Sequence, residues 1–182
     1  SDKTTFRFSY TNTANEAIQP TNQFKRNNFN LRATQKIGKY VNMDASMAYA
    51  TSKTINPLLQ GGNSNPLFRF AFSNSRNLPL DYVLNNYLNP TLGGSNVVAP
   101  YLRGSNIQPL WQLYQVNIEN KEDQILANLD LNAKILPWLT ALVRSNINSL
   151  NVQRENRTPG DGANFGIGPN FSGSYSLFQS NS

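Results

Sequence analysis

The sequence predicts an all-β protein: a segment of a large antiparallel transmembrane β-barrel, with about five strands and long extracellular loops that carry short helices. Three observations favour this class. Apolar and polar residues alternate along runs of about ten residues, the length of a tilted membrane-spanning strand. Tiny turns alternate with very long connections. Uncharged polar residues, above all Asn, dominate the composition, as expected where one face of every strand meets water.

The alternation is clearest over residues 24–51, which we expect to form two strands joined by a tight turn at Gly38-Lys39. Successive side chains on a strand point to opposite faces, so each strand has one apolar and one polar face. We expect the apolar face to meet lipid and the polar face to meet a wet lumen. The apolar set is Phe29, Leu31, Ala33, Ile37, Val41, Met43, Ala45, Met47 and Tyr49.

Three further runs follow the same rule. Residues 4–13 form the first expected strand, followed by a polar loop over 14–23. The pattern resumes at Asp123 and continues through a tight turn at Leu136-Pro137-Trp138 into a strand that ends near Arg157. The closing run SYSLFQSNS resembles a strand that is cut off, after a Gly-rich loop over 158–173.

The connections predict the orientation. The turn at Gly38-Lys39 is minimal, whereas the next connection spans about Thr54 to Asn120. Outer-membrane barrels have short periplasmic turns and long extracellular loops, so the tight turns are expected on the periplasmic side. Within the long connection, Asn65 before Pro66 predicts a helix over 67–74, and Gln108-Pro109 suggests a second short helix.

Composition and charge exclude several classes. Hydrophobic residues make up 38% and charged residues 14%, too few for an ordinary soluble core or a charged disordered chain, respectively. The net charge is +6, but Lys and Arg are scattered, so no nucleic-acid partner is expected. With neither Cys nor His, we expect no catalytic residue, metal site or cofactor. No signal peptide or apolar helical span is present, so we expect a processed or internal piece of a longer chain.

Several runs together resemble one family. TTFRFSYTNT, FKRNNFNLRATQKI, GGNSNPLF, GSYSLFQSNS and above all PLWQLYQVNIENKEDQILANLDLNAKILPWLTALVR are similar to the SusC/RagA family of TonB-dependent outer-membrane transporters. The resemblance covers almost the whole chain. It implies a barrel of about twenty-two strands, of which residues 1–182 are one part, without the plug domain, signal peptide, TonB box or C-terminal strand.

The resemblance also implies a function and partners. Members import oligosaccharides or peptides across the bacterial outer membrane, under a SusD-like surface lipoprotein that forms a lid. TonB supplies the work from the periplasm, through regions outside this chain. The protein would be a transporter embedded in outer-membrane lipid and not an enzyme.

Two groups of residues are candidates for contact with solute or partners. Charged residues of inward parity line the lumen or meet the plug, or else form a charge ladder between strands: Arg7, Arg32, Asp44, Asp130 and Arg144, with Lys36 and Lys134. Residues of the long connection touch the substrate or the lid, or else pack the loop: Arg69, Arg76, Tyr82, Tyr101, Arg103 and Trp111. The carboxylates Glu119, Glu122 and Asp123 form a solvated strand end or, less simply, a metal or acid–base site.

Two other functions stay open. A soluble all-β carbohydrate-binding module would pack the apolar faces of two sheets together, but it should show turns about every 8–12 residues. A passive porin would share the wall architecture and differ in having no plug.

Overall fold

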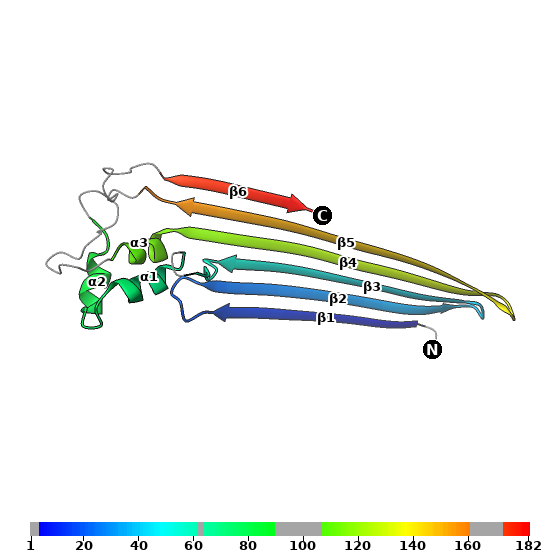
Figure 1. The fold of residues 1–182 in the computed structure, drawn as a ribbon. Coiled ribbons are helices and arrows are strands. Elements are labelled where there is room, and N and C mark those ends of the chain that lie inside the picture. Colours follow the sequence, from blue (N-terminus) through cyan, green and yellow to red (C-terminus); the bar gives the residue numbers. More distant parts are fainter. Residues whose placement is uncertain (1–3, 62–63, 90–106, 161–172) are drawn as a thin grey trace.

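The protein forms one antiparallel sheet with a group of helices at one end (Figure 1). The computed structural model describes residues 4–61, 64–89, 107–160 and 173–182. Six strands lie in the sheet in the order of the sequence, so each pairs with the next. Their bounds are β1 Thr4–Glu16, β2 Gln23–Ile37, β3 Val41–Ile55, β4 Asn117–Leu136, β5 Leu139–Thr158 and β6 Ser174–Asn181.

The all-β class is confirmed, and so is the expected short strand after the five full ones. The final run forms β6, whose eight residues all pair with β5. In the described part of the chain the sheet is open, with β1 and β6 at its edges. The structure therefore shows an amphipathic sheet and not a closed barrel.

Two tight turns lie together at the end of the sheet away from the helices (Figure 1). Residues 38–40 connect β2 to β3, and Gly38 adopts a φ of 64°, a left-handed conformation that glycine accepts without strain. Pro137 and Trp138 connect β4 to β5, where Leu136 pairs with Leu139 beyond a register shift. Both turns were predicted at these positions.

The strands extend further toward the helices than the alternation predicts. β4 begins at Asn117, not at Asp123, and β1 continues to Glu16. Residues 117–122 are mostly polar on both parities, so they give no periodic signal. Their backbone nevertheless pairs with both β3 and β5, because hydrogen bonding in a ladder does not depend on the side chains.

Three short helices form what we call the helical cap, which lies beside the ends of the strands (Figure 1). Two were predicted: in α1 the side chain of Asn65 accepts a hydrogen bond from the backbone N–H of Phe68 at 3.1 Å, as a helix N-cap does. The third, α2, was not predicted, because the residue before it is Pro79, which offers no side-chain cap. Their bounds are α1 Pro66–Ser73, α2 Leu80–Asn86 and α3 Gln108–Gln115.

Among the described residues, the hydrophobic core lies in the cap and not in the sheet. Val83, Ile107, Leu110 and Leu113 form a buried cluster, and residues from α1 and α2 pack around it. The large apolar side chains of the strands are exposed, among them Phe8 at 59%. The six strands thus present two uncovered faces.

Candidate functional site: two faces of the sheet and the helical cap

The register divides the strand residues into an apolar face and a polar face. Register neighbours share their character in two adjacent rows near the middle of the sheet. Phe8, Leu31, Met47, Ala127 and Ile147 form an apolar row. The next row on the other face is polar throughout, with Arg7, Arg32, Ser46, Asn128 and Asn146. The predicted division into an apolar and a polar face is therefore confirmed in these rows.

Aromatic side chains mark both ends of an uncharged band on the apolar face. Tyr10, Phe29 and Tyr49 are register neighbours, with ring centroids 4.8 and 6.2 Å apart. Tyr40 and Trp138, in the turns, are 65% and 79% exposed. Between these two levels, the described strand residues of the apolar face carry no charge.

The height of this band can be estimated from β3. From Tyr40 to Tyr49 the strand rises about 30 Å, at about 3.3 Å per residue. With the strand tilt of about 40° found in outer-membrane barrels, the band is about 23 Å tall, close to the apolar band of about 25 Å in such proteins. The dimension therefore fits a bilayer core.

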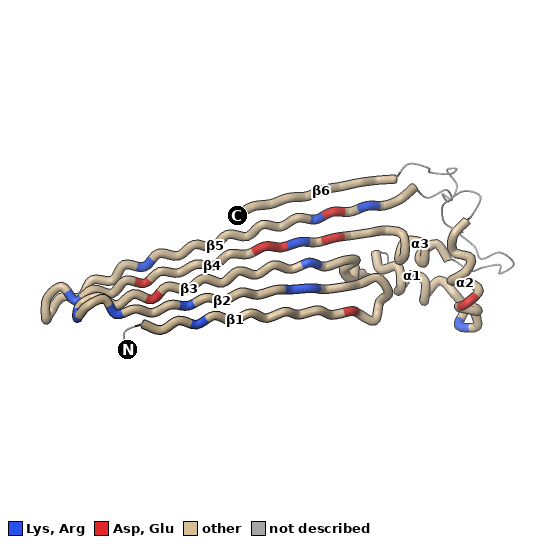
Figure 2. The backbone as a smooth tube through the Cα atoms, turned by 180° about the vertical axis from the view of Figure 1, so that it is seen from behind, with Lys and Arg blue, Asp and Glu red and all other residues tan. Residues whose placement is uncertain are grey.

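On the polar face, charged residues lie at the same depth along the strands as the uncharged band of the apolar face. Figure 2 shows two groups of charges along the strands, one beside the helices and one nearer the tight turns. In the second group Arg32 donates to Asp44 at 3.2 and 2.7 Å, and Arg144 donates to Asp130 at 2.8 and 3.2 Å. Each guanidinium thus binds one carboxylate through two hydrogen bonds, the bidentate geometry of a strong charge-assisted pair.

The two carboxylates are also direct neighbours, a feature that sequence reasoning missed. Asp44 on β3 pairs in register with Asp130 on β4, and like charges in this position repel. The two arginines offset this repulsion from either side. The cluster is therefore a charge ladder across β2–β5, as one of the two interpretations predicted, and it is exposed to solvent.

A second network lies beyond the aromatic row, on the apolar-parity face near the cap. Glu119 accepts from Lys121 and from Lys53, each at 2.8 Å. Hydrogen bonds from Lys121 and then Lys53 lower the pKa of Glu119, and the same bond raises the pKa of Lys121. Glu122 has the opposite parity to Glu119 and Asp123, so these three carboxylates do not converge. The solvated strand end is the interpretation that this geometry favours.

The cap places the predicted loop residues in different settings. Arg69 donates to the side-chain oxygen of Gln112 at 2.9 Å and joins α1 to α3. Tyr82 packs against the core of the cap, and Trp111 is buried. Arg76 is exposed. Tyr101 and Arg103 lie outside the described residues.

Two residues with unusual backbone conformations lie where the strands meet the cap: Asn56 joins the end of β3 to the start of β4, and Thr21 joins the β1–β2 connection to α3. Asn56, with a φ of 47°, donates its N–H to Ile118 O at 2.7 Å, and its side-chain oxygen accepts from Ile118 N at 2.8 Å. Thr21, with a φ of 68°, donates its hydroxyl to Leu113 O at 3.1 Å. A polar loop was expected over 14–23, but no sequence pattern indicated that this loop contacts a helix far along the chain.

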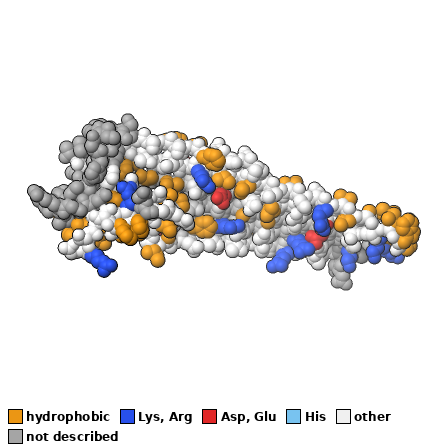
Figure 3. All heavy atoms as spheres, in the orientation of Figure 1, with side chains coloured by type: hydrophobic (Ala, Val, Ile, Leu, Met, Phe, Trp, Pro, Cys, Tyr) orange, Lys and Arg blue, Asp and Glu red, His pale blue; other side chains and the backbone are white. Residues whose placement is uncertain are grey.

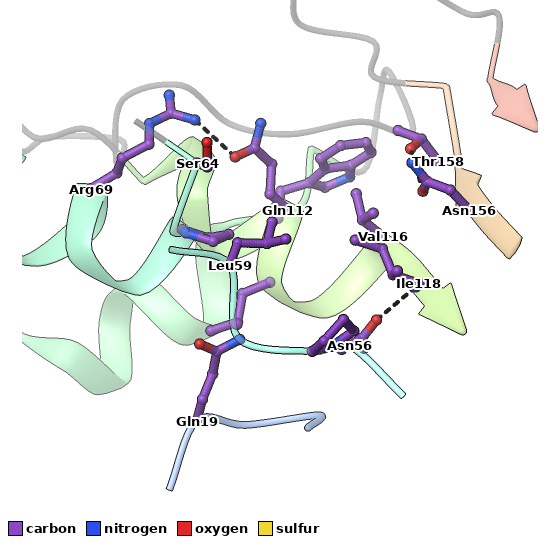
Figure 4. A pocket seen from close by; sticks show the side chains of 14 residues that line it. Gln19, Asn56, Leu59, Ser64, Arg69, Gln112, Val116, Ile118, Asn156 and Thr158 are labelled. Atoms are coloured by element: carbon purple, nitrogen blue, oxygen red, sulfur yellow. Dashed lines mark hydrogen bonds between the residues drawn. The ribbon is translucent and has the colours of Figure 1, made fainter. Parts of the chain in front are cut away.

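A cavity of about 300 Å³ separates the cap from the strand ends (Figure 4). Gln19, Arg69, Trp111 and Gln112 line it together with Asn156 and Thr158 of β5. Gln19 is 92% buried, yet its Oε1 has no hydrogen-bond partner among the described residues. Asn156 and Thr158 have the parity of the polar face, so the cavity opens on the same side of the sheet as the charge ladder.

The described residues contain no group of carboxylates that could hold a metal ion. In the same ranges, none of the helices is both long and apolar enough to cross a bilayer. The charge ladder and the cavity beside the cap offer charged groups and hydrogen-bonding groups that could bind and orient a polar ligand.

No protein-family model matches the chain, and no curated protein matches it. The geometry, together with the resemblance described above, is therefore the basis for any functional proposal.

Proposed function

We propose that this chain forms part of the wall of a bacterial outer-membrane β-barrel transporter. One observation carries the proposal: at the same depth along the strands, the apolar face has no charge and the polar face has Arg7, Arg32, Asp44, Asp130 and Arg144. Charged groups avoid the hydrocarbon of a bilayer unless they meet water or a partner. The contrast is what a wall with lipid outside and a water-filled passage inside requires.

The exposure of both faces of the sheet favours a barrel wall and argues against a β-sandwich. In a β-sandwich the apolar faces of two sheets bury each other. Within the described ranges no second sheet lies on the apolar face, and Phe6, Val143 and Ile147 remain 60% or more exposed. Lipid contact would remove this apolar surface from water, and further strands at the edges of β1 and β6 would close the ladder.

The two ends of the sheet support one orientation. Tight turns belong on the periplasmic side of such barrels and long loops outside, so the helical cap faces the exterior. There its cavity, on the polar side of the sheet, lies where a solute would enter. On the resemblance to SusC/RagA proteins, that solute is an oligosaccharide or peptide, the lid is a SusD-like lipoprotein, and TonB drives uptake.

Surface labelling of intact cells tests the proposal. The chain has no cysteine, so a single Arg76→Cys or Lys39→Cys reports without background. A membrane-impermeant maleimide should label Arg76→Cys in intact cells and Lys39→Cys only after the outer membrane is opened. The reverse pattern would contradict the orientation, and labelling of both in intact cells would contradict a bilayer between them.

Energy dependence separates the transporter from a passive porin. A protonophore should abolish solute accumulation by cells that express the transporter, because TonB depends on the proton gradient. A porin would continue to equilibrate solute under the same treatment. Persistence of uptake would replace the transporter with a porin and leave the wall architecture intact.

A further inference from the structure

Positive charge exceeds negative charge on the polar face, in the half of the sheet nearer the tight turns. The described residues there comprise five cations and two carboxylates: Arg7, Arg32, Lys36, Lys134 and Arg144 against Asp44 and Asp130. The apolar face has no charge at this depth. The imbalance therefore belongs to the side that the proposed barrel turns toward its passage. On the face that Figure 3 presents, charged side chains stand in separate groups against a mostly uncharged surface.

Both carboxylates are already engaged within the sheet. Asp44 accepts two hydrogen bonds from Arg32, and Asp130 accepts two from Arg144. A two-pronged contact of this kind uses both oxygens of a carboxylate. The remaining cations are therefore not neutralised by the described wall itself.

Arg7 is the remaining cation with the most suitable surroundings. It pairs in register with Arg32, whose guanidinium is committed to Asp44, and it has no ion pair within the described ranges. Two like charges in register repel each other. An anion placed beside them would relieve that repulsion.

A hollow is present at this position. A shallow depression of about 440 Å³ on the sheet is lined on its polar side by Arg7, Ser9, Asn30, Arg32 and Asn128, with the apolar side chains of Ala48 and Leu126 beside them. Hydroxyl and amide donors thus stand next to an unpaired guanidinium. This is the donor set that a carboxylate with neighbouring hydroxyl or carbonyl oxygens would need.

We propose that this hollow binds a carboxylate group of a hydrophilic solute as it moves along the passage. Arg7 grips the carboxylate, and Ser9 and Asn30 donate to further oxygens of the solute. Lys36 and Lys134 extend the positive surface toward the tight turns and attract anions along the wall. The inference rests on the proposed function and names acidic solutes, not neutral ones, as the class that the wall favours.

Two probes with the same sugar skeleton, one anionic and one neutral, test this inference. The purified full-length protein in detergent is titrated with trigalacturonate and with its methyl ester. The acid should bind more tightly than the ester, and the difference should shrink as salt screens the charges. Arg7→Gln should weaken binding of the acid by roughly fivefold to tenfold and leave the ester unchanged, because only the charge-assisted hydrogen bonds are lost.

Matched variants complete the design. Lys25→Gln removes one positive charge from an exposed position on the opposite face of the sheet and should change neither affinity, whereas Arg7→Lys should retain part of the preference for the acid. Equal binding of acid and ester, or an unchanged affinity in Arg7→Gln, overturns the inference. A third result also overturns it: Arg7→Gln releases an acidic protein segment from the barrel and leaves solute binding unchanged. Arg7 would then bind that segment and not the solute.

Insertion into lipid vesicles, read as resistance to protease, keeps the two proposals distinct. A protein that inserts but does not discriminate between the probes overturns the acidic-solute inference alone. A protein that fails to insert overturns the membrane wall, and this inference with it.

Discussion

The sheet and the helical cap bury their apolar side chains in opposite ways. In the cap, Val83 and Ile107 have no exposed surface and α1, α2 and α3 pack around them. In the sheet, Phe8 and Val143 are about 60% exposed, and no described residue covers their face. One region has a core of its own, whereas the apolar face of the other has no cover among the described residues.

The difference teaches where each region would find its stability. A region with a protein core loses contacts when a core side chain is truncated, because a cavity remains. A region that faces lipid loses little stability when a side chain is truncated, because lipid fills the space. A charge placed on that face destabilises it strongly. The two regions should therefore respond in opposite ways to the same kinds of substitution.

Truncation is the first way to break the comparison. Leu113→Ala, at a site 4% exposed in the cap, should destabilise the cap by about 2–5 kcal/mol. Hydrogen exchange of the cap amides measures this loss locally. Leu129→Ala, at a site 37% exposed on the apolar face, is the matched control and should cost far less. Equal losses at the two sites would mean that a protein layer covers the sheet.

Charge insertion reverses the order of sensitivity. Leu129→Arg should cost about 2–4 kcal/mol, because residue 129 lies near the middle of the uncharged band. Asn128→Arg, on the adjacent residue and the polar face, should cost much less, since its direct register neighbours are the uncharged polar residues Ser46 and Asn146. Unfolding titrations in lipid vesicles give both values. If the two variants lost the same stability, the assignment of the faces would be wrong.

The same contrast explains what the sequence could predict. The faces of β2 and β3 follow from a period of two, a local property that Phe29, Leu31 and Ala33 express directly. The turn at Gly38 is equally local. Where both parities are polar, as over residues 117–122, periodicity gives no signal, and the start of β4 was placed six residues late.

Contacts between distant segments were beyond sequence reasoning. Asp44 and Asp130 meet because β3 and β4 pair in one register, and that register is set across the whole of the long connection. The parity of each residue was predictable, but their opposition was not. Likewise, nothing local indicated that Thr21 would donate to Leu113 O or that Gln19 would be buried under the cap.

The candidate site was predictable in kind but not in arrangement. Four charged residues were expected on one face, and the structure places them there as two ion pairs, Arg32 with Asp44 and Arg144 with Asp130. That arrangement leaves Arg7 without an ion pair in the described part of the chain, which a list of inward charges could not reveal. The loop candidates diverge more, because Trp111 lies in α3 and is buried in the cap, whereas Arg76 lies in the turn between α1 and α2 and is exposed.

The smallest expected effect lies between the two regions, at Glu119. Hydrogen bonds from Lys121 and Lys53 lower the pKa of Glu119 in the folded state. Its contribution to stability is therefore present above the pKa of the unfolded chain, and it is lost as the pH falls through the lowered folded value. The free energy of unfolding should decline in that acidic window, and Glu119→Gln should flatten part of the decline.

Glu122→Gln is the matched control for this effect. It removes a carboxylate from the same strand on the opposite face, away from Lys53 and Lys121. Subtracting its stability curve from that of Glu119→Gln isolates the lysine-bound carboxylate from the general effect of charge. Because both lysines are exposed and screened by water, the effect should be smaller than either side-chain change in the cap or the band. Parallel curves for the two variants would show that the network at Glu119 does not stabilise the strand ends.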